Sequence, residues 1–446
     1  MRISVIGTGY LGAVHAAGLA EIGHEVLGMD IDQDKIAALS SGNAPFYEDD
    51  FEDMLVRNAR DGRIRFTTSL DEAAAFADVH FLCVGTPQSE EGNSADLRQL
   101  KGVIRDFVPR IRKDSLLIGK STVPVGTSDT IRQLISEHGA SGVAIELAWN
   151  PEFLREGQAV HDTMAPDRIV AGVGSGTAEK RLRDIYDPLI RKGVPFFVTN
   201  IATAELVKMA SNSFLATKLS FINAMSEICD LTGADVVHLA EAVGEDRRIG
   251  RSYFKAGLGF GGGCLPKDIR ALYSYGQQAN VGKALDFLPV VDEINLRCRE
   301  RTVAAARRLC GGSLAGAAVA VLGAAFVPNS DDIRDSPALA VATACAAEGA
   351  LVRVHDVRAL QRASQAIPTL TYDDEVLGVC EGADVVLHLT DWREYQDLDP
   401  AEVKSVVART RIFDARNALP ADRWRAAGWT FEGIGRPNGG SLAGIA

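Results

Sequence analysis

The first thirty residues contain a pattern that few folds accommodate. A strand-like run at 2–6 leads directly into GTGYLG at 7–12. Residues 10–22 then have the apolar spacing of a helix, and a second strand-like run at 25–29 ends in Asp30. Glycines at this spacing make a tight strand-to-helix turn and let a pyrophosphate reach the helix N-terminus. The pattern therefore predicts a doubly wound α/β domain that binds a dinucleotide.

Asp30 indicates which dinucleotide this is. It lies at the distance from the glycines expected for a carboxylate that binds the adenosine ribose. A carboxylate there repels the 2′-phosphate of NADP, so we expect NAD. An ordinary strand-to-helix turn is the alternative, but the strand, helix, second strand and acid all agree with the dinucleotide interpretation.

The strand pattern continues through the first 200 residues. Buried strands that run into a turn or polar segment are expected at 77–87, 115–127 and 144–157, with shorter strands at 168–173 and 195–199. Thr86 and Thr122 then lie at the carboxyl edge of the sheet, where ligands bind in this architecture. If 151–156 is helical, Glu152 and Glu156 lie one turn apart on one face. By pattern alone, a solvated acidic face is the favoured explanation of these two residues.

The middle of the chain predicts two long helices, at 201–232 and about 284–309. Lys208 and Asn212 are four residues apart and therefore share one face of the first helix. A solvent-facing pair is the simpler explanation of those two residues. Long helices between two α/β parts suggest a connector that also serves dimerisation.

An unusual cysteine stands between these helices. Three glycines at 261–263 precede Cys264, residues 265–266 resemble the first turn of a helix, and Lys267 and Asp268 follow. Glycines bring backbone close to another group and leave room around the sulfur. A thiol at a helix N-terminus near a lysine is expected to have a lowered pKa. The segment is therefore a candidate nucleophile, with a buried cysteine in a tight turn as the alternative.

A second strand–turn–helix series begins at 316–326, with later strands at 351–356, 383–392 and 411–416. No GxGxxG follows its first strand, so a second pyrophosphate site is not expected. The fold class is therefore α/β, with two doubly wound Rossmann-like domains joined by a long-helix connector. We predict domains at 1–200, 201–310 and 311–446.

Composition limits the classes of function. The 446 residues carry 47 Lys and Arg against 59 Asp and Glu, a net charge of −12, which argues against nonspecific nucleic-acid binding. No apolar run approaches the ~18 residues of a membrane helix, and the N-terminus lacks the features of a signal peptide. Seven cysteines are scattered without a CxxC or Cys/His cluster, so we expect a cytoplasmic protein without a structural metal.

Six ordered stretches together resemble the nucleotide-sugar 6-dehydrogenases of the UDP-glucose/GDP-mannose dehydrogenase family. They are GTGYLG (7–12), STVPVGT (121–127), NPEFLREG (150–157), ELVKMASNSFLATKLSFINAMSEIC (205–229), GFGGGCLPKD (259–268) and DDIRDSPAL (331–339). The resemblance covers nearly the whole chain and is strongest to the members that act on UDP-glucose. It implies four-electron oxidation of a sugar C6 alcohol to a carboxylate, with two NAD and no metal. GDP-mannose or a UDP-N-acetylhexosamine is the alternative substrate.

The resemblance also implies residue roles. Cys264 captures the C6 aldehyde as a thiohemiacetal, which is oxidised to a thioester and hydrolysed. The other implied catalytic residues surround the reacting oxygen or line the same cleft: Lys208, Asn212, Asp268, Glu152, Glu156 and Thr122. Two proton acceptors fit the first oxidation, Lys208 itself or a water held by Lys208 and Asp268. Glu152 or Glu156 then activates the hydrolytic water.

The implied binding residues fall into two groups. Those near NAD are Gly7, Gly9, Tyr10, Leu11, Gly12, Asp30, Lys35, Thr86, Thr122, Glu156, Lys267 and Arg334. Those near the nucleotide sugar are Phe153, Leu154, Lys208, Asn212, Arg248, Tyr253, Lys255, Gly261, Cys264 and Arg416. Arg248 resembles an arginine that reaches the substrate of a neighbouring subunit, which implies a homodimer or larger homo-oligomer.

One position departs from the family. Its members usually carry a lysine where this chain has Val327, which puts one charged contact to cofactor or substrate in doubt. Two rival functions are weaker. A two-electron hydroxy-acid dehydrogenase has no use for Cys264, and a non-catalytic sensor has no reason to keep Lys208, Asn212, Cys264 and Asp268 together.

Overall fold

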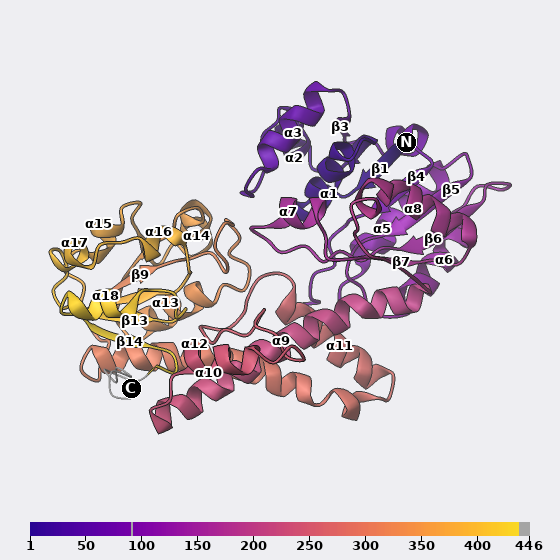
Figure 1. Ribbon diagram of the computed structural model, residues 1–446. Helices are drawn as coiled ribbons and strands as arrows, with labels where there is room; N and C mark the ends of the chain where they lie inside the picture. Colours follow the sequence, from indigo (N-terminus) through magenta and orange to yellow (C-terminus); the bar gives the residue numbers. More distant parts are fainter. Residues whose placement is uncertain (91, 437–446) are drawn as a thin grey trace. The chain divides into compact units, whose positions relative to one another are not determined.

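The computed structural model describes residues 1–90 and 92–436 (Figure 1). The chain forms two compact units. The N-terminal unit comprises residues 1–212 and 270–285, and the C-terminal unit comprises 213–269 and the residues from 286 onward. The three domains expected from the sequence stay a prediction.

The N-terminal unit is built on one eight-stranded sheet, in the order β3-β2-β1-β4-β5-β6-β7-β8. The strands are β1 (Arg2–Ile6), β2 (Glu25–Met29), β3 (Ile64–Thr67), β4 (Val79–Leu82), β5 (Ser115–Gly119), β6 (Ile145–Trp149), β7 (Ile169–Gly172) and β8 (Phe196–Thr199). Every described neighbouring pair is parallel except β6 and β7, which meet at Trp149 and Gly172. The predicted doubly wound sheet is confirmed.

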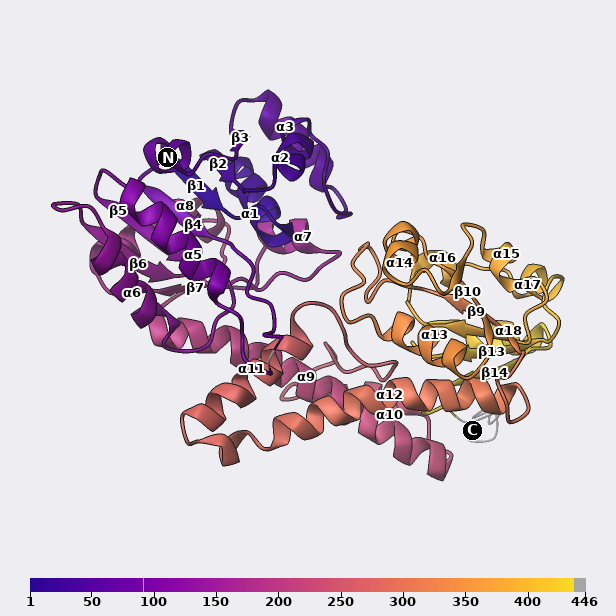
Figure 2. The ribbon, with the colours of Figure 1, turned by 180° about the vertical axis from the view of Figure 1, so that it is seen from behind.

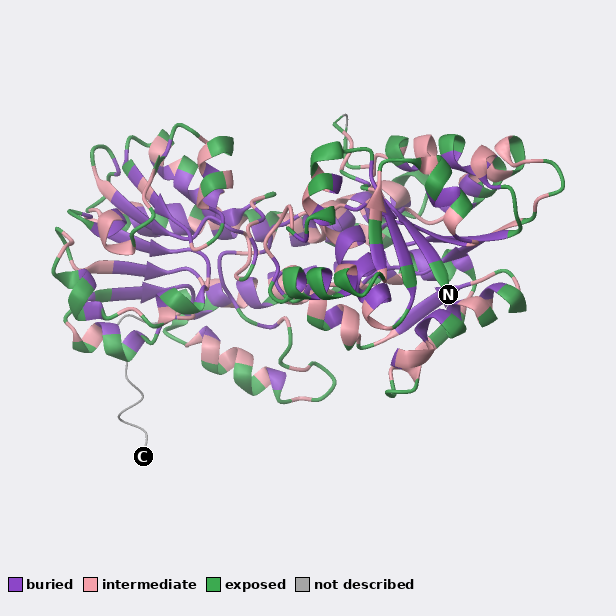
Figure 3. Ribbon diagram, turned by 90° about the horizontal axis from the view of Figure 1, so that it is seen from above, coloured by how far each residue is buried: buried purple, intermediate pink, exposed green. Residues whose placement is uncertain are grey.

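Helices cover both faces of this sheet because its central strands are apolar on both sides. They are α1 (Tyr10–Glu21), α2 (Gln33–Ser40), α3 (Phe51–Arg60), α4 (Leu70–Phe76), α5 (Arg98–Phe107), α6 (Thr127–His138), α7 (Ala159–Met164) and α8 (Gly176–Ile190), with a 3-10 turn at Val108–Arg110. One apolar layer joins α1, α3 and α8 to the sheet, and the other joins α4, α5 and α6. The inner strands of the sheet are accordingly almost wholly buried (Figure 3), and β4 and β5 are buried at every residue.

The C-terminal unit repeats the architecture with a six-stranded parallel sheet, in the order β11-β10-β9-β12-β13-β14. Its strands are β9 (Ala318–Leu322), β10 (Leu351–His355), β11 (Thr371–Tyr372), β12 (Val385–His388), β13 (Arg411–Asp414) and β14 (Thr430–Gly433). Its helices are α13 (Pro337–Ala347), α14 (Leu360–Ala366), α15 (Val376–Cys380), α16 (Arg393–Gln396), α17 (Pro400–Lys404) and α18 (Ala421–Ala426), which Figure 2 shows from behind. The second Rossmann-like domain is thus confirmed.

Four helices lie between the two sheets in the sequence. They are α9 (Ile201–Thr232), α10 (Val236–Gly244), α11 (Leu265–Gln278) and α12 (Phe287–Leu309). The predicted bounds of α9 are confirmed. The helix expected from about 284 begins at Phe287 instead, because a 3-10 turn occupies Gly282–Leu285.

The helix considered for residues 151–156 is not formed. Residues 151–155 have no regular secondary structure, and a turn follows at 156–157. The Glu152 side chain accepts a hydrogen bond from the Leu154 backbone N–H at 2.6 Å. A local bond of this kind competes with the helical hydrogen-bond pattern. Glu152 and Glu156 therefore do not share a helix face.

Among residues 1–90 and 92–436, no helix is long and apolar enough to cross a bilayer. In the same residues, no group of three or more His, Cys, Asp and Glu side chains is placed to hold a metal ion.

Candidate active site

The turn after β1 fits a bound pyrophosphate. Gly7 has a φ of +91°, which favours glycine. A Cβ on Gly12 would lie 1.8 Å from the Gly7 carbonyl oxygen, so Gly12 lets α1 approach the turn. A Cβ on Gly9, at the helix N-terminus, would have no described heavy atom within 4 Å. Gly7 and Gly12 thus allow the tight turn, and Gly9 leaves space at the helix N-terminus, where a pyrophosphate would bind.

Asp30 follows β2 and is held firmly beside this turn. Its carboxylate accepts the Thr8 backbone N–H at 2.8 Å and pairs with Lys35 Nζ at 3.1 Å. Asp30 is buried and Lys35 is half-buried. The predicted ribose-binding carboxylate and Lys35 are therefore adjacent.

This geometry predicts the cofactor preference. A 2′-phosphate would meet the Asp30 carboxylate, so kcat/KM with NAD should exceed that with NADP by at least about tenfold, or ~1.4 kcal/mol. Asp30→Asn keeps an acceptor for the Thr8 N–H and releases Lys35 to pair with the phosphate. The ratio should then shift towards NADP, and equal kcat/KM values for the two cofactors in the unchanged protein would refute the prediction.

Tyr10 belongs to a buried cluster that sequence reasoning missed. Its hydroxyl donates to Glu48, whose carboxylate also accepts the Gly157 backbone N–H at 2.8 Å and the Ala159 N–H at 2.5 Å. Burial raises the pKa of Glu48 and, more strongly, that of Tyr10. Glu48 thereby ties the segment after Glu156 to α1. No local sequence signal distinguishes Glu48 from its exposed acidic neighbours.

Lys208 and Glu152 form a buried ion pair. Lys208 Nζ lies 3.0 Å from Glu152 Oε1, and the two side chains are 5% and 8% exposed. The ammonium also lies 5.7 Å from the centre of the Phe153 ring. Asn212, one turn along α9 from Lys208, is 6% exposed. Lys208 and Glu152 are therefore not the solvent-facing residues that pattern alone favoured.

A second lysine lies beneath this pair. Lys120, which follows β5, is 6% exposed and donates to Asn150 Oδ1 at 2.9 Å. The Tyr186 hydroxyl donates to the same oxygen at 2.6 Å. Burial lowers the pKa of Lys120 to about 8. Lys120 thus links the end of β5, which precedes Thr122, to the end of β6, which precedes Glu152. The sequence signal that could have identified Lys120 is a charged residue at the end of an apolar strand.

Thr86 and Thr122 meet at the same edge of the sheet. The Thr86 hydroxyl donates to the Thr122 backbone carbonyl at 2.7 Å. These residues follow β4 and β5, which are neighbours in the sheet. The expectation that both strand ends lie together is confirmed.

The glycines before Cys264 are explained by close neighbours in the C-terminal unit. A Cβ on Gly261 would lie 2.3 Å from the Asp335 carbonyl oxygen, and one on Gly262 would lie 2.6 Å from the Phe326 ring. A Cβ on Gly263 would lie 2.6 Å from the Arg334 guanidinium. The glycines therefore let the backbone approach other groups closely, as the sequence suggested, and these groups belong to the protein itself.

Cys264 immediately precedes α11, as predicted. The Asp268 backbone N–H donates to the Cys264 carbonyl at 2.9 Å, within the first turn. The Asp268 carboxylate is 1% exposed and pairs with Lys267 Nζ at 2.6 Å. Cys264 itself is half-buried. The thiol, the carboxylate and the ammonium thus occupy one helix N-terminus, where an anion is favoured.

The remaining predicted residues of the C-terminal unit differ in their hydrogen-bond and ion-pair partners and in their exposure. Arg416 donates to the carbonyls of Leu389 at 2.6 Å, Gly259 at 3.1 Å and Phe326 at 3.4 Å. Arg334 pairs with Asp332, Lys255 lies 3.7 Å from Asp391, and Arg248, 89% exposed, pairs with Asp246. Tyr253 has a φ of +55°, and Val327 is half-buried. Arg416 is therefore also a link between three loops.

The predicted residues divide between the two units. Glu152, Lys208 and Asn212 lie in the N-terminal unit, with the dinucleotide turn. Cys264, Asp268 and the arginines at 248, 334 and 416 lie in the C-terminal unit. Each unit thus carries its own part of the predicted chemistry.

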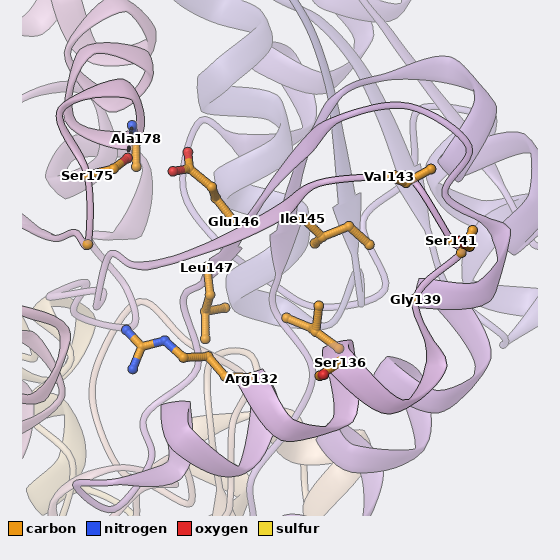
Figure 4. A pocket seen from close by; sticks show the side chains of 13 residues that line it. Arg132, Ser136, Gly139, Ser141, Val143, Ile145, Glu146, Leu147, Ser175 and Ala178 are labelled. Carbon is orange, nitrogen blue, oxygen red and sulfur yellow. Dashed lines mark hydrogen bonds between the residues drawn. The ribbon is translucent and has the colours of Figure 1, made fainter.

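Two pockets lie away from these residues. One of about 590 Å³ in the N-terminal unit is lined by the end of α6, the start of β6 and the start of α8 (Figure 4). Arg132, Glu146 and Ser175 are among its residues, at the opposite end of β6 from Glu152. The other, about 640 Å³, adjoins His355 and Asp356 in the C-terminal unit. The described lining of each pocket includes none of the predicted site residues.

Comparison with known proteins matches three parts of the chain to three domains of one protein family. Residues 1–190 match the NAD-binding domain of the UDP-glucose/GDP-mannose dehydrogenase family, 202–297 its central domain and 320–421 its UDP-binding domain. UDP-glucose 6-dehydrogenase YwqF of Bacillus subtilis is 40% identical over 437 residues, covering 98% of each chain.

Two solved structures extend the comparison. A UDP-glucose dehydrogenase from Pyrobaculum islandicum matches with a TM-score of 0.90 and 37% identity, covering 98% of both chains. A UDP-D-ManNAc dehydrogenase from Pyrococcus horikoshii matches with a TM-score of 0.85 and 26% identity, covering 98% of this chain and 100% of that one. The protein is thus an NAD-dependent oxidoreductase, and the chain belongs to the UDP-glucose/GDP-mannose dehydrogenase family.

Proposed function

We propose that this protein oxidises the C6 alcohol of UDP-glucose to the carboxylate of UDP-glucuronate through a covalent intermediate on Cys264. The observation that carries the proposal is the placement of Cys264 at the N-terminus of α11, with Lys267 and Asp268 in the first turn. A dehydrogenase that stopped at the aldehyde would not need this thiol. The UDP-glucose 6-dehydrogenase relative of 40% identity supports the choice of sugar.

The first oxidation needs a proton acceptor and stabilisation of negative charge on the C6 oxygen. Lys208 supplies a buried ammonium, and Asn212, on the same face of α9, supplies an amide donor. The proton acceptor is either Lys208 in its neutral amine form, which becomes the ammonium when it takes the alcohol proton, or a water held by Lys208 and Asp268. NAD, held by the proposed dinucleotide site, would supply the hydride acceptor for each of the two oxidations. The Glu152 carboxylate, 3.0 Å from Lys208, keeps that side chain in place.

The second oxidation needs an addition to the aldehyde. The Cys264 thiolate forms a bond to the aldehyde carbon, and the carbonyl oxygen takes a proton. The resulting thiohemiacetal loses that proton and its C6 hydrogen, as hydride, to become a thioester. Water then breaks the carbon–sulfur bond and releases the carboxylate and the thiolate. Glu152 or Glu156 activates this water as a general base.

Binding of the nucleotide sugar is proposed for the residues that the family resemblance implies. Phe153, Leu154, Gly261, Tyr253, Lys255 and Arg416 contact the substrate in this proposal. Arg248 reaches the substrate of a neighbouring subunit, and its high exposure supports that role. Near NAD, Leu11, Thr86, Thr122, Glu156, Lys267 and Arg334 complete the proposed set.

A second candidate substrate follows from the comparisons. The similar structure from Pyrococcus horikoshii is a UDP-D-ManNAc dehydrogenase, so a UDP-N-acetylhexosamine is the alternative. The test is NADH formation with UDP-glucose, GDP-mannose and UDP-N-acetylhexosamines, assayed side by side. We expect the highest kcat/KM with UDP-glucose and two NADH per sugar. A higher kcat/KM with another sugar would overturn the choice of substrate.

We also propose a homodimer, because α9 carries an exposed apolar stripe. Phe214, Phe221 and Ile228 recur every seven residues and are 67%, 51% and 53% exposed. Side chains seven apart share one helix face, and a stripe of this kind is typical of a helix–helix interface. A second copy of the same helix satisfies it by two-fold symmetry.

The dimer predicts an effect of charge on the stripe. Phe221→Glu should shift the protein from dimer to monomer at micromolar concentration in sedimentation velocity, because a carboxylate would be buried in the interface. Val56→Glu is the matched control, since Val56 on α3 is 51% exposed and lies outside α9. A monomeric unchanged protein, or a Phe221→Glu dimer as tight as the control, would contradict the proposal.

A cytoplasmic location is the last part of the proposal. The seven cysteines form no disulfide, and all seven lie in the described residues. Free thiols are typical of a reducing compartment. Fractionation of cells that produce the protein should recover it with cytoplasmic markers, and recovery with secreted or membrane markers would contradict this inference.

A further inference from the structure

The buried carboxamide of Asn295 forms hydrogen bonds with the backbone of Phe260, the residue just before the glycines that precede Cys264. Asn295, on α12, is 0% exposed. Its Oδ1 accepts the Phe260 backbone N–H at 2.7 Å, and its Nδ2 donates to the Phe260 carbonyl at 3.0 Å. One side chain thus satisfies both backbone groups of a residue that is itself only 6% exposed. Buried backbone groups need such partners because water cannot reach them.

The neighbouring glycine is fitted to this carboxamide. Gly259 has a φ of +90°, and a Cβ there would lie 2.4 Å from Asn295 Oδ1. The loop backbone therefore lies so close to α12 that there is no room for a Cβ at position 259. Two further bonds hold the preceding residues, from Gly257 N–H to Asn223 Oδ1 at 2.8 Å and from Arg416 to the Gly259 carbonyl. Asn295 is the described side chain that fixes both groups of Phe260, four residues before the thiol.

We propose that Asn295 is a positioning residue for Cys264. It holds the backbone of Phe260 in a fixed position against α12. The glycines at 261–263 follow directly, so their position is fixed as well, and the Cys264 thiol is held in one orientation. The inference rests on the proposed function, since it assumes that the Cys264 sulfur reacts. It concerns a side chain with no expected contact to NAD or sugar.

Removal of the carboxamide tests this. Asn295→Ala should lower kcat by at least about tenfold, because misplacing a reacting group by about 1 Å costs up to about a hundredfold. The dissociation constant for NAD should stay within about twofold, because the dinucleotide turn lies in the other unit. The rate of Cys264 alkylation by iodoacetamide, followed by mass spectrometry of the Cys264 peptide, should change by at least about threefold.

The matched control is Thr302→Ala on the same helix. Thr302 is also 0% exposed, and its hydroxyl donates to the Cys298 carbonyl at 2.9 Å rather than to the loop. This variant removes a buried polar group from α12 without touching Phe260. Its kcat and its Cys264 alkylation rate should equal those of the unchanged protein even if its melting temperature falls.

A second variant approaches the same contact from the loop. Gly259→Ala would push a Cβ against Asn295 Oδ1, so it should show the same loss of kcat with unchanged NAD affinity. The effects of Gly259→Ala and Asn295→Ala on kcat should be less than additive, because both disturb one contact. Gly259→Ala also carries the test if Asn295→Ala does not fold.

The outcomes separate this inference from the proposed function. If Asn295→Ala and Gly259→Ala match Thr302→Ala in kcat and alkylation rate, the positioning role is wrong. Fully additive effects of the two variants would also overturn it. If instead Cys264→Ala still produces two NADH per sugar at the unchanged rate, the proposed function itself fails, whatever the Asn295 variants show.

Discussion

Cys264→Ala is expected to stop the reaction after the first oxidation. The first hydride leaves an alcohol carbon, which needs a proton acceptor but no nucleophile, so slow formation of one NADH per sugar should persist. The second oxidation requires an addition to the aldehyde, and alanine offers none. Loss of a nucleophile of this kind lowers kcat by up to about a millionfold in a well-studied case. NAD and sugar binding should remain, because the change removes only the thiol group and leaves the other proposed NAD and sugar residues in place.

The measurement is NADH per sugar together with mass spectrometry of the protein. The unchanged enzyme should give two NADH, the carboxylate product and a sugar adduct on Cys264 under single turnover. Cys264→Ser is the matched variant, because it keeps the size and polarity of the side chain. It should also fail in the second step, since a hydroxyl is a far weaker nucleophile than a thiolate at neutral pH. If Cys264→Ala gives two NADH per sugar at nearly the unchanged rate, the thiol is structural.

The sequence predicts this chain well wherever the signal is local. The strand, glycine turn, helix and Asp30 of the first unit fall within thirty residues, and their bounds agree with β1, α1 and β2. The same holds for α9, whose predicted bounds are confirmed at both ends. Short strands at the sheet edges, such as β11 at Thr371–Tyr372, were missed because two residues give no periodicity.

The failures arise where distant contacts decide the local structure. Residues 151–156 suit a helix by pattern, but Glu152 bonds to the Leu154 N–H and pairs with Lys208, which lies 56 residues away in the sequence. Asn295 was missed for the same reason. Nothing near it in the sequence indicates that its carboxamide binds Phe260. Positions of this kind follow from tertiary packing, which a single sequence does not reveal.

The C-terminal sheet shows how one architecture serves two purposes. Asp356 follows β10 as Asp30 follows β2, but it binds more of the neighbouring turn: its Oδ2 accepts the backbone N–H groups of Ala324 at 2.6 Å and Ala325 at 2.9 Å, where Asp30 accepts that of Thr8. Its Oδ1 accepts those of Arg358 and Ala359. The turn after β9 is therefore stabilised by a carboxylate of the protein itself. In the first unit, Gly9 keeps the corresponding turn open for a ligand.

Lys208→Met should lower both stability and activity, and the two effects can be separated. Lys208 and Glu152 are a buried pair at 3.0 Å, so removing one partner leaves a buried charge. Losses of this kind amount to about 3–5 kcal/mol of unfolding free energy. The ammonium also stabilises the oxyanion in our mechanism, and loss of one such donor costs about 10²–10³ in kcat. Urea unfolding and steady-state NADH formation measure the two effects.

The double variant Lys208→Met with Glu152→Gln distinguishes the two roles of the lysine. Neutralising both partners removes the uncompensated charge, so most of the lost unfolding free energy should return. The activity should not return, because no ammonium then lies beside the C6 oxygen and Glu152, a candidate general base, has also been neutralised. Lys218→Met is the matched control on α9, since Lys218 donates to the backbone carbonyls of Ile249, Gly250 and Ser252. If the double variant regains the kcat of the Lys218→Met control, Lys208 acts only through the ion pair and has no part in the chemistry.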